Sequence, residues 1–189
     1  MAVFIVPIFF AFRYLYKHDR QLLERRIQGK ETIGEQKLLI RLLKAVLVAS
    51  LLLPGLDFRF GWSRTSLGTV PLWLTLLSQA LVLGCVLLVF WVMKVNSFAS
   101  RTIQVEAGQK LISSGLYRLV RHPMYFGFVG IFLSTPLALG SYIALPAFAL
   151  LIPLIVVRLL NEEKILKQEL AGYPEYCRSV RFRLVPYIW

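Results

Sequence analysis

Apolar residues run along this chain in long stretches that short polar segments separate. Three of the apolar stretches cover residues 1–16, 38–56 and 70–93. As α-helices, the second and third are long enough to cross a hydrocarbon core about 30 Å thick, and the first, at about 24 Å, is barely long enough. The pattern therefore predicts a membrane-spanning helix at each of the three stretches.

The connections between these three helices differ in character. Residues 17–37 are polar and basic, and they lead into the second helix. Pro54 and Gly55 disfavour a helix interior, so we expect the second helix to close at this pair. Residues 57–69 are rich in glycine and serine, and this composition predicts an irregular loop.

The segment 123–157 contains 35 residues without a single charge. As one helix it would be about 52 Å long, far more than the roughly 30 Å hydrocarbon core, so it must fold back. Gly140 and Ser141 are the natural place for the turn. A fold at Gly140 would bring His122 and Arg158 to the same membrane depth on neighbouring helices. The sequence thus predicts an all-α integral membrane protein of about five transmembrane helices, the last two forming a hairpin.

The composition adds to this prediction by excluding other classes of protein. Apolar residues make up 57% of the 189 and charged residues 17%, which leaves too few polar side chains to cover a soluble domain. The 22 Lys and Arg outnumber the 10 Asp and Glu, and they lie between the apolar stretches instead of alternating with aromatics. This placement is typical of basic flanks that face membrane lipids, so we expect no nucleic-acid partner.

The distribution of Lys and Arg also predicts how the chain is oriented. These residues number eight over 17–44, two over 57–69, five over 94–122 and six over 158–189. Basic connections face the cytoplasm in multi-pass membrane proteins. We therefore expect residues 57–69 outside and both later polar stretches on the cytoplasmic side.

The chain contains no internal repeat and no low-complexity segment. We expect a single domain over residues 1–189, with a hydrophobic helical half over 1–93 and a motif-bearing catalytic half over 94–189. Cys85 and Cys177 form neither a CxxC pair nor a Cys/His cluster, so the sequence indicates no disulfide framework and no metal site.

Arg121, His122 and Pro123 open the fourth predicted helix. Proline is favoured at the first helical position, which accounts for Pro123 without any function. Residue preferences at the start of a helix do not explain why Arg121 and His122 occur together at the membrane surface. A helix N-terminus also binds carboxylates favourably. The local pattern therefore leaves a functional and a purely structural interpretation equally open.

Arg158 and Glu162 are four residues apart, which places them on one face of a helix. They could form a surface ion pair, with Arg158 reaching lipid phosphates. The hairpin instead places Arg158 beside His122, which favours a site. Glu163 pairs naturally with Lys167, so we assign it a structural role. The basic residues of the C-terminal tail, Arg178, Arg181 and Arg183, are typical of lipid-facing positive charge.

Four motifs occur in order in the second half of the chain. They are Ser114-Gly115-Leu116-Tyr117, Arg121-His122-Pro123-Met124-Tyr125-Phe126-Gly127, Arg158 with Glu162-Glu163, and Tyr173-Pro174-Glu175-Tyr176. With these motifs, residues 94–189 resemble the isoprenylcysteine carboxyl methyltransferase family. That family belongs to a wider group of integral membrane methyltransferases that includes phospholipid N-methyltransferases.

The resemblance implies S-adenosylmethionine as the methyl donor, in a pocket at the cytoplasmic mouth of the last hairpin and without a metal. It implies Arg158 as the catalytic residue, which would bind the anionic group of the substrate. The residues that it implies for the cofactor are Gln104, Gln109, Lys110, Leu111, Ile112, Tyr117, His122, Pro123, Met124, Tyr125 and Glu162.

The chemistry of the reaction favours one class of methyl acceptor. Methyl transfer from a sulfonium is a direct displacement that needs an aligned nucleophile and the exclusion of water. A carboxylate is nucleophilic at neutral pH, and an arginine can hold it through two parallel hydrogen bonds. An amine would first need to lose a proton, and His122 is the one obvious base. We therefore expect a lipophilic carboxylate from the bilayer, such as an isoprenylcysteine-type group on a small molecule or a lipidated protein.

Three alternatives remain open at the level of the sequence. The enzyme could methylate a phospholipid amine, in which case Arg158 would hold a phosphate, or it could methylate a thiol. A non-catalytic lipid-binding membrane protein could also keep the fold without the chemistry. Binding of the cofactor separates this last class from the enzymes.

Overall fold

The computed structural model describes residues 2–28, 34–98, 105 and 108–189, and every regular element in these residues is helical. This confirms the predicted all-helical class for the described part of the chain. The elements are α1 (Ala2–His18), α2 (Arg20–Gln28), α3 (Gly34–Phe60), α4 (Trp62–Ser66), α5 (Leu72–Val95), the 3₁₀ helix η1 (Gly115–Arg118), α6 (Pro123–Ala138), α7 (Ala144–Ala149), α8 (Leu151–Glu169) and α9 (Tyr173–Ser179).

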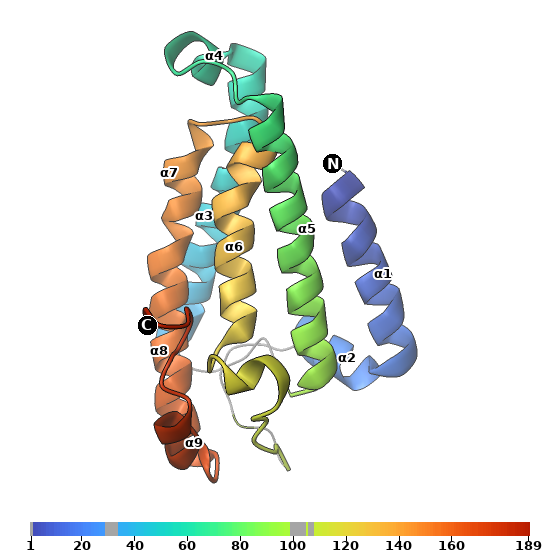
Figure 1. Ribbon diagram of the computed structural model, residues 1–189, viewed down its shortest axis with the longest axis vertical. Helices are drawn as coiled ribbons and strands as arrows, with labels where there is room; N and C mark the ends of the chain where they lie inside the picture. The colour runs from blue at the N-terminus through green and yellow to red at the C-terminus, as the bar shows by residue number, and fades with distance from the viewer. Residues whose placement is uncertain (1, 29–33, 99–104, 106–107) are drawn as a thin grey trace.

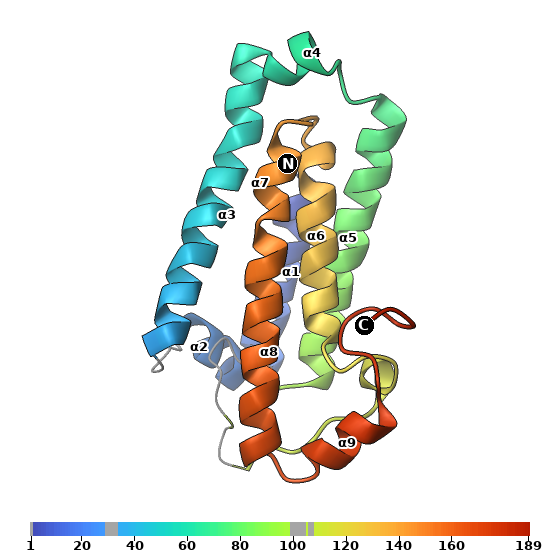
Figure 2. The same ribbon diagram turned by 90° about the vertical axis from the view of Figure 1, so that its left-hand side faces the viewer.

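The long helices pack side by side, with α7 and α8 following one another along a single column (Figures 1 and 2). The short helix α4 lies at one end of this bundle, which we call the α4 end. Helices α2, η1 and α9 gather at the opposite end, which we call the motif end because all four sequence motifs reach it. The bundle therefore places the predicted chemistry at one of its two ends.

Three segments are long and apolar enough to cross a membrane: Gln36–Phe60, Leu72–Val95 and Ala144–Glu169. The shorter helix α6 is also apolar. Many of their apolar side chains are exposed, as expected for helices whose solvent is lipid. The chain is a membrane protein, and the number of helices that cross the bilayer remains a prediction.

The predicted end of the second helix is wrong, because α3 continues through Pro54 to Phe60. Proline removes one backbone hydrogen bond, a loss that neighbouring contacts can offset. Here the final turn of α3 is held by Asp57, whose buried carboxylate accepts hydrogen bonds from the backbone N–H of Ser63 at 2.6 Å and from the hydroxyl of Ser141. Residues 57–69 therefore include the end of α3 and helix α4 instead of an irregular loop.

Helices α6 and α8 run in opposite directions along the bundle (Figures 1 and 2). The turn between α6 and α7 covers residues 139–143, with Gly140 in the left-handed conformation at φ 76°. His122 Nε2 lies 3.5 Å from the carboxylate of Glu163, a contact that the sequence did not predict. The common membrane depth of His122 and Arg158 remains a prediction.

Helices α5 and α6 approach each other closely at two glycines of α6. A Cβ atom added at Gly127 would lie 2.6 Å from Val89 Cγ2, and one added at Gly130 would lie 2.5 Å from Cys85 Sγ. Small residues at such contacts let membrane helices pack backbone to backbone. This packing brings the end of α5 next to the segment that leads into α6, where Asn96 Nδ2 donates a 2.9 Å hydrogen bond to the Tyr117 hydroxyl.

Candidate active site

A cavity opens at the motif end, among the end of α5, the segment 109–112, η1, the start of α6, α8 and α9. It contains about 800 Å³ of empty space, counting the part that is open to solvent. We call it the first cavity.

Most of the residues predicted for the cofactor line the first cavity. They are Gln109, Lys110, Leu111, Ile112, Tyr117, His122, Met124, Tyr125 and Glu162. Pro123 is buried in the first turn of α6, between two of the lining residues. Gln104 lies outside the residues that the structure describes. Four separate segments of the chain thus meet at this cavity.

Tyr125 connects the two charged residues of the predicted site. Its hydroxyl donates a 2.6 Å hydrogen bond to Glu162 Oε2, and the positive charge of Arg158 lies near it. Its ring is buried against Ile155 and Leu159 of α8, so the position of the hydroxyl is fixed by packing. Glu162 and Arg158 therefore lie on either side of one tyrosine.

Arg158 does not line the first cavity but a neighbouring one, which we call the second cavity. The second cavity contains about 820 Å³ of empty space, again counting the part that is open, and its walls come from α2, α3, α6 and α8. Met124 and Tyr125 line both cavities. These two side chains form a shared wall, with Glu162 on the side of the first cavity and Arg158 on the side of the second.

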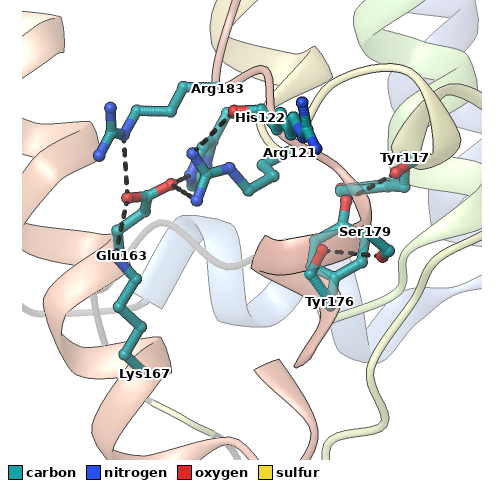
Figure 3. Close-up of polar contacts among 9 residues, drawn as sticks. Tyr117, Arg121, His122, Glu163, Lys167, Tyr176, Ser179 and Arg183 are labelled. Carbon is teal, nitrogen blue, oxygen red and sulfur yellow. Dashed lines mark hydrogen bonds and ion pairs between the residues drawn. The ribbon is translucent and has the colours of Figure 1, made fainter. Parts of the chain in front are cut away.

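Glu163 is the centre of a buried ion cluster, which Figure 3 shows. Its side chain is only 3% exposed, and its carboxylate lies 2.9 Å from Arg121 Nη1 and 3.1 Å from Arg183 Nε. Lys167 Nζ lies 3.5 Å away, which confirms the predicted pair at the helix surface. The cluster ties α8 to the start of α6 and to the C-terminal segment. Arg183 therefore pairs with a buried carboxylate, and the expectation that it faces lipid is wrong.

Backbone hydrogen bonds reinforce the same connection. The N–H groups of Arg121 and His122 donate to the carbonyls of Phe182 and Arg183, each at 2.9 Å. The C-terminal segment thus pairs with the two residues that precede α6. This pairing fixes the entry of α6, and with it the position of the first cavity.

Tyrosines form part of the lining of the first cavity. The hydroxyl of Tyr176 donates a 2.7 Å hydrogen bond to the carbonyl of Tyr117, which joins α9 to η1 (Figure 3). Burial raises the pKa of Tyr117 to about 12 and also raises the pKa values of Tyr173 and Tyr176. At neutral pH these phenols stay protonated, so they remain hydrogen-bond donors towards a ligand.

Several residues that line the two cavities could not be recognised from the sequence. Asn96 of the first cavity, and Arg26 and Lys44 of the second, belong to no motif, and their contacts come from segments far away in the chain. Tyr173 and Tyr176 were part of a recognised motif, but no role followed from their spacing. Only the motif itself could have pointed to them.

The model of the isoprenylcysteine carboxyl methyltransferase family matches residues 73–168, which is about half of the chain. The chain belongs to this family. The match confirms the resemblance inferred from the motifs. It extends from the start of α5 to the end of α8, so it includes Arg158, Glu162 and the start of α6, but not α2, α3 or α9.

One curated relative has a name that refers to a different activity. The chain is 34% identical over 91 residues to Delta(14)-sterol reductase TM7SF2 of Mus musculus. The match covers 47% of this chain and 22% of the relative. The chain thus corresponds to about a fifth of the length of that relative.

Proposed function

We propose that this protein is a membrane methyltransferase that transfers the methyl group of S-adenosylmethionine to a lipophilic acceptor. The observation that carries the proposal is the shared wall of the two cavities. Met124 and Tyr125 lie between a cavity of mixed polar and apolar lining beside Glu162 and a largely apolar cavity beside Arg158. Direct displacement requires the two reactants to touch, so we place their reacting ends where the two cavities adjoin at these side chains, with one reactant entering from the cytoplasm and the other from the bilayer. Membership of the methyltransferase family supports this division of roles.

The first cavity has the chemical character that the methyl donor requires. Glu162 offers a carboxylate for an ammonium group or for ribose hydroxyls, and the tyrosine hydroxyls offer donors. Leu111, Ile112 and Leu166 offer apolar surface for an aromatic base. When bound, S-adenosylmethionine supplies a methyl group on a positively charged sulfur. The roles of the other predicted residues, including Gln104 and Pro123, are part of this proposal.

Arg158 is the residue that would bind and aim the acceptor. A guanidinium can hold a carboxylate through two parallel hydrogen bonds, which fixes the orientation of the nucleophilic oxygen. Tyr125 hydrogen-bonds Glu162 and lines the second cavity together with Arg158, so it lies between the two charged side chains. Buried apolar side chains around Tyr125 exclude water, which would otherwise solvate the carboxylate and weaken it as a nucleophile.

A carboxylate acceptor of the isoprenylcysteine type fits these residues best, because it needs no general base. His122 lines the first cavity, which the proposal assigns to the cofactor, and it is not among the residues that line the second cavity, so it is poorly placed to act as a base for an amine acceptor. Methylation of a phospholipid amine or of a thiol remains a second possibility. The products differ in one simple property, since an ester is hydrolysed by alkali whereas an N-methyl or S-methyl product is stable.

Reduction of a lipophilic substrate is a further candidate, which the similarity to Delta(14)-sterol reductase TM7SF2 favours. A reductase needs a hydride donor, such as a reduced nicotinamide nucleotide, in place of a methyl donor. A reduced nicotinamide nucleotide that binds in place of S-adenosylhomocysteine would favour this candidate.

The topology of the chain is part of the proposal. We place the motif end on the cytoplasmic side, because the segments at that end carry most of the Lys and Arg residues. In this arrangement α1, α3, α5, α6 and the column of α7 and α8 would cross the bilayer as one multi-pass domain. The acceptor, a small lipid or a lipidated protein, would enter from the surrounding membrane lipids.

Calorimetric titration of the purified, detergent-solubilised protein with S-adenosylhomocysteine, the expected product, tests the proposal. We expect saturable binding by the wild-type protein and loss of binding in Glu162→Ala. If a well-folded sample does not bind this ligand, the methyltransferase proposal is wrong, and a non-catalytic lipid-binding protein becomes the better interpretation. Incubation with radiolabelled S-adenosylmethionine and membrane lipids, followed by alkali, then identifies the class of acceptor.

A further inference from the structure

The second cavity contains a cationic side chain that no motif accounts for, Arg26 of α2. Its Nη2 lies 2.9 Å from the sulfur of Met124, and its Nε has no hydrogen-bond partner among the described residues. A thioether is a weak acceptor, whereas a guanidinium carries five N–H donors. Within the described part of the protein, the guanidinium of Arg26 thus has few hydrogen-bond acceptors for its N–H groups.

Another arginine of the same helix shows the ordinary arrangement. The side chain of Arg20 is 68% exposed and pairs with Glu24 at 2.9 Å, one helical turn away. Arg26 instead points into the bundle, where burial lowers its pKa and Tyr125, Tyr117 and Glu162 oppose this effect. It remains charged, because the ordinary pKa of arginine lies far above neutrality. A charged group withdrawn from water is costly unless a partner binds it.

The surroundings of Arg26 indicate which partner that is. Arg26 contacts Met124, and Arg158 lines the same cavity as Met124 and Tyr125, so both guanidinium groups lie near the wall shared by the two cavities. The exposed Lys44 of α3 adds a third cation to the same cavity. The remaining lining is apolar and comes from α3 and α6: Ile40, Leu43, Leu47 and Phe128. The second cavity thus has cations beside the shared wall and apolar side chains elsewhere. This arrangement fits an amphiphile, whose anionic head would lie at the cations and whose hydrocarbon chain would lie on the apolar side chains.

We propose that Arg26 is a second anion-binding residue of the acceptor site, so that the head group is held between Arg26 and Arg158. The acceptor is an amphiphile whose head is a carboxylate or a phosphate monoester and whose hydrocarbon chain lies against α3. This inference rests on the proposed function, because it takes the second cavity as the acceptor site. It also makes α2, which lies outside the family-matched residues 73–168, part of the active site.

The test uses simple amphiphiles and the full-length protein in a neutral detergent. Binding of dodecanoate, dodecyl phosphate and the uncharged dodecanol is measured by calorimetry for wild type, Arg26→Gln, Arg26→Lys and the matched control Arg20→Gln. We expect the wild type to bind at least one of the two anions and to bind dodecanol far more weakly. In Arg26→Gln the affinity for that anion should fall at least about tenfold, and Arg20→Gln should match the wild type. Arg26→Lys, which keeps the charge, should lie between them.

Each outcome decides the role of Arg26. Tighter binding of dodecanoate would support a carboxylate head, and tighter binding of dodecyl phosphate a phosphate head. Wild-type anion affinity in Arg26→Gln, or no anion binding by the wild type, would overturn the inference. Titration with S-adenosylhomocysteine is run in parallel. If Arg26→Gln lost affinity for S-adenosylhomocysteine as strongly as for the anion, Arg26 would support the cofactor site beside Glu162 instead of the acceptor site. Failure of the wild type to bind the nucleoside would count against the methyltransferase proposal alone.

Discussion

The hydroxyl of Tyr125 donates a 2.6 Å hydrogen bond to the carboxylate of Glu162, and both residues line the first cavity. One comes from the first turn of α6 and the other from the C-terminal half of α8. Because Tyr125 also lines the second cavity together with Arg158, this pair joins the proposed cofactor site to the proposed acceptor site.

Tyr125→Phe should weaken the binding of S-adenosylhomocysteine about tenfold. Glu162 would lose a charge-assisted hydrogen bond of about 1.5–3 kcal/mol while the ring and its packing stay in place. Calorimetric titration measures the effect. Tyr142→Phe, in the turn at the α4 end, is the matched control and should bind like the wild type. Unchanged affinity in Tyr125→Phe would mean that this hydrogen bond does not position Glu162.

Glu162→Ala should impair ligand binding, whereas Glu163→Ala should impair the stability of the fold. Glu163→Ala removes the carboxylate that pairs with the buried Arg121 and with Arg183, so we expect a loss of about 3–5 kcal/mol of unfolding free energy. Glu162→Ala should lose the nucleoside ligand and keep its thermal unfolding temperature. Thermal unfolding in detergent, followed by circular dichroism, separates the two. Equal unfolding temperatures would contradict the structural role of Glu163.

Gly127→Ala should destabilise the contact between α5 and α6, because the new methyl group would lie 2.6 Å from Val89 Cγ2. Such overpacking costs about 1–3 kcal/mol. Gly84→Ala is the matched control on α5, since a Cβ at Gly84 meets no atom within 4 Å. The control should be neutral or slightly stabilising, because alanine favours a helix over glycine. Chemical unfolding in detergent measures both variants, and equal effects would show that α5 and α6 do not depend on this close approach.

Asp57→Ala should loosen the α4 end while leaving the motif end intact. Asp57 is 4% exposed, and its carboxylate binds Ser63 of α4 and Ser141 of the turn between α6 and α7. Loss of these bonds leaves buried donors unpaired, at about 1–3 kcal/mol for each group. Hydrogen exchange should rise in residues 61–68 and 139–143. The exposed Ser66 provides a control, Ser66→Ala, in which exchange in the turn should not change.

The apolar helices could be predicted from the sequence because burial in lipid is a property of each segment by itself. A helix in a membrane satisfies its own backbone hydrogen bonds, so length and hydropathy suffice to locate it. The motif residues could be located in the same way, since Tyr117, Met124 and Glu162 were recognisable from their neighbours in the chain. The structure places all three at one cavity.

Helix ends and the packing across the hairpin depended on contacts between distant residues. Nothing near Pro54 indicates that Asp57, Ser63 and Ser141 hold the following turn, so the helix was predicted to stop there. The uniformly apolar hairpin gave no sign of which side chains meet across it, so the contact between His122 and Glu163 was not predicted.

The sequence by itself determined that this is a helical membrane protein of the isoprenylcysteine carboxyl methyltransferase family, because hydropathy and local motifs are carried by contiguous residues. Only the tertiary structure decided how those motifs divide into two cavities, with Tyr125 between Glu162 and Arg158. It also decided that Arg26 of α2 faces the same wall. The physical reason is that the direction of a side chain across a bundle depends on how the other helices pack. A local sequence pattern carries no information about this packing.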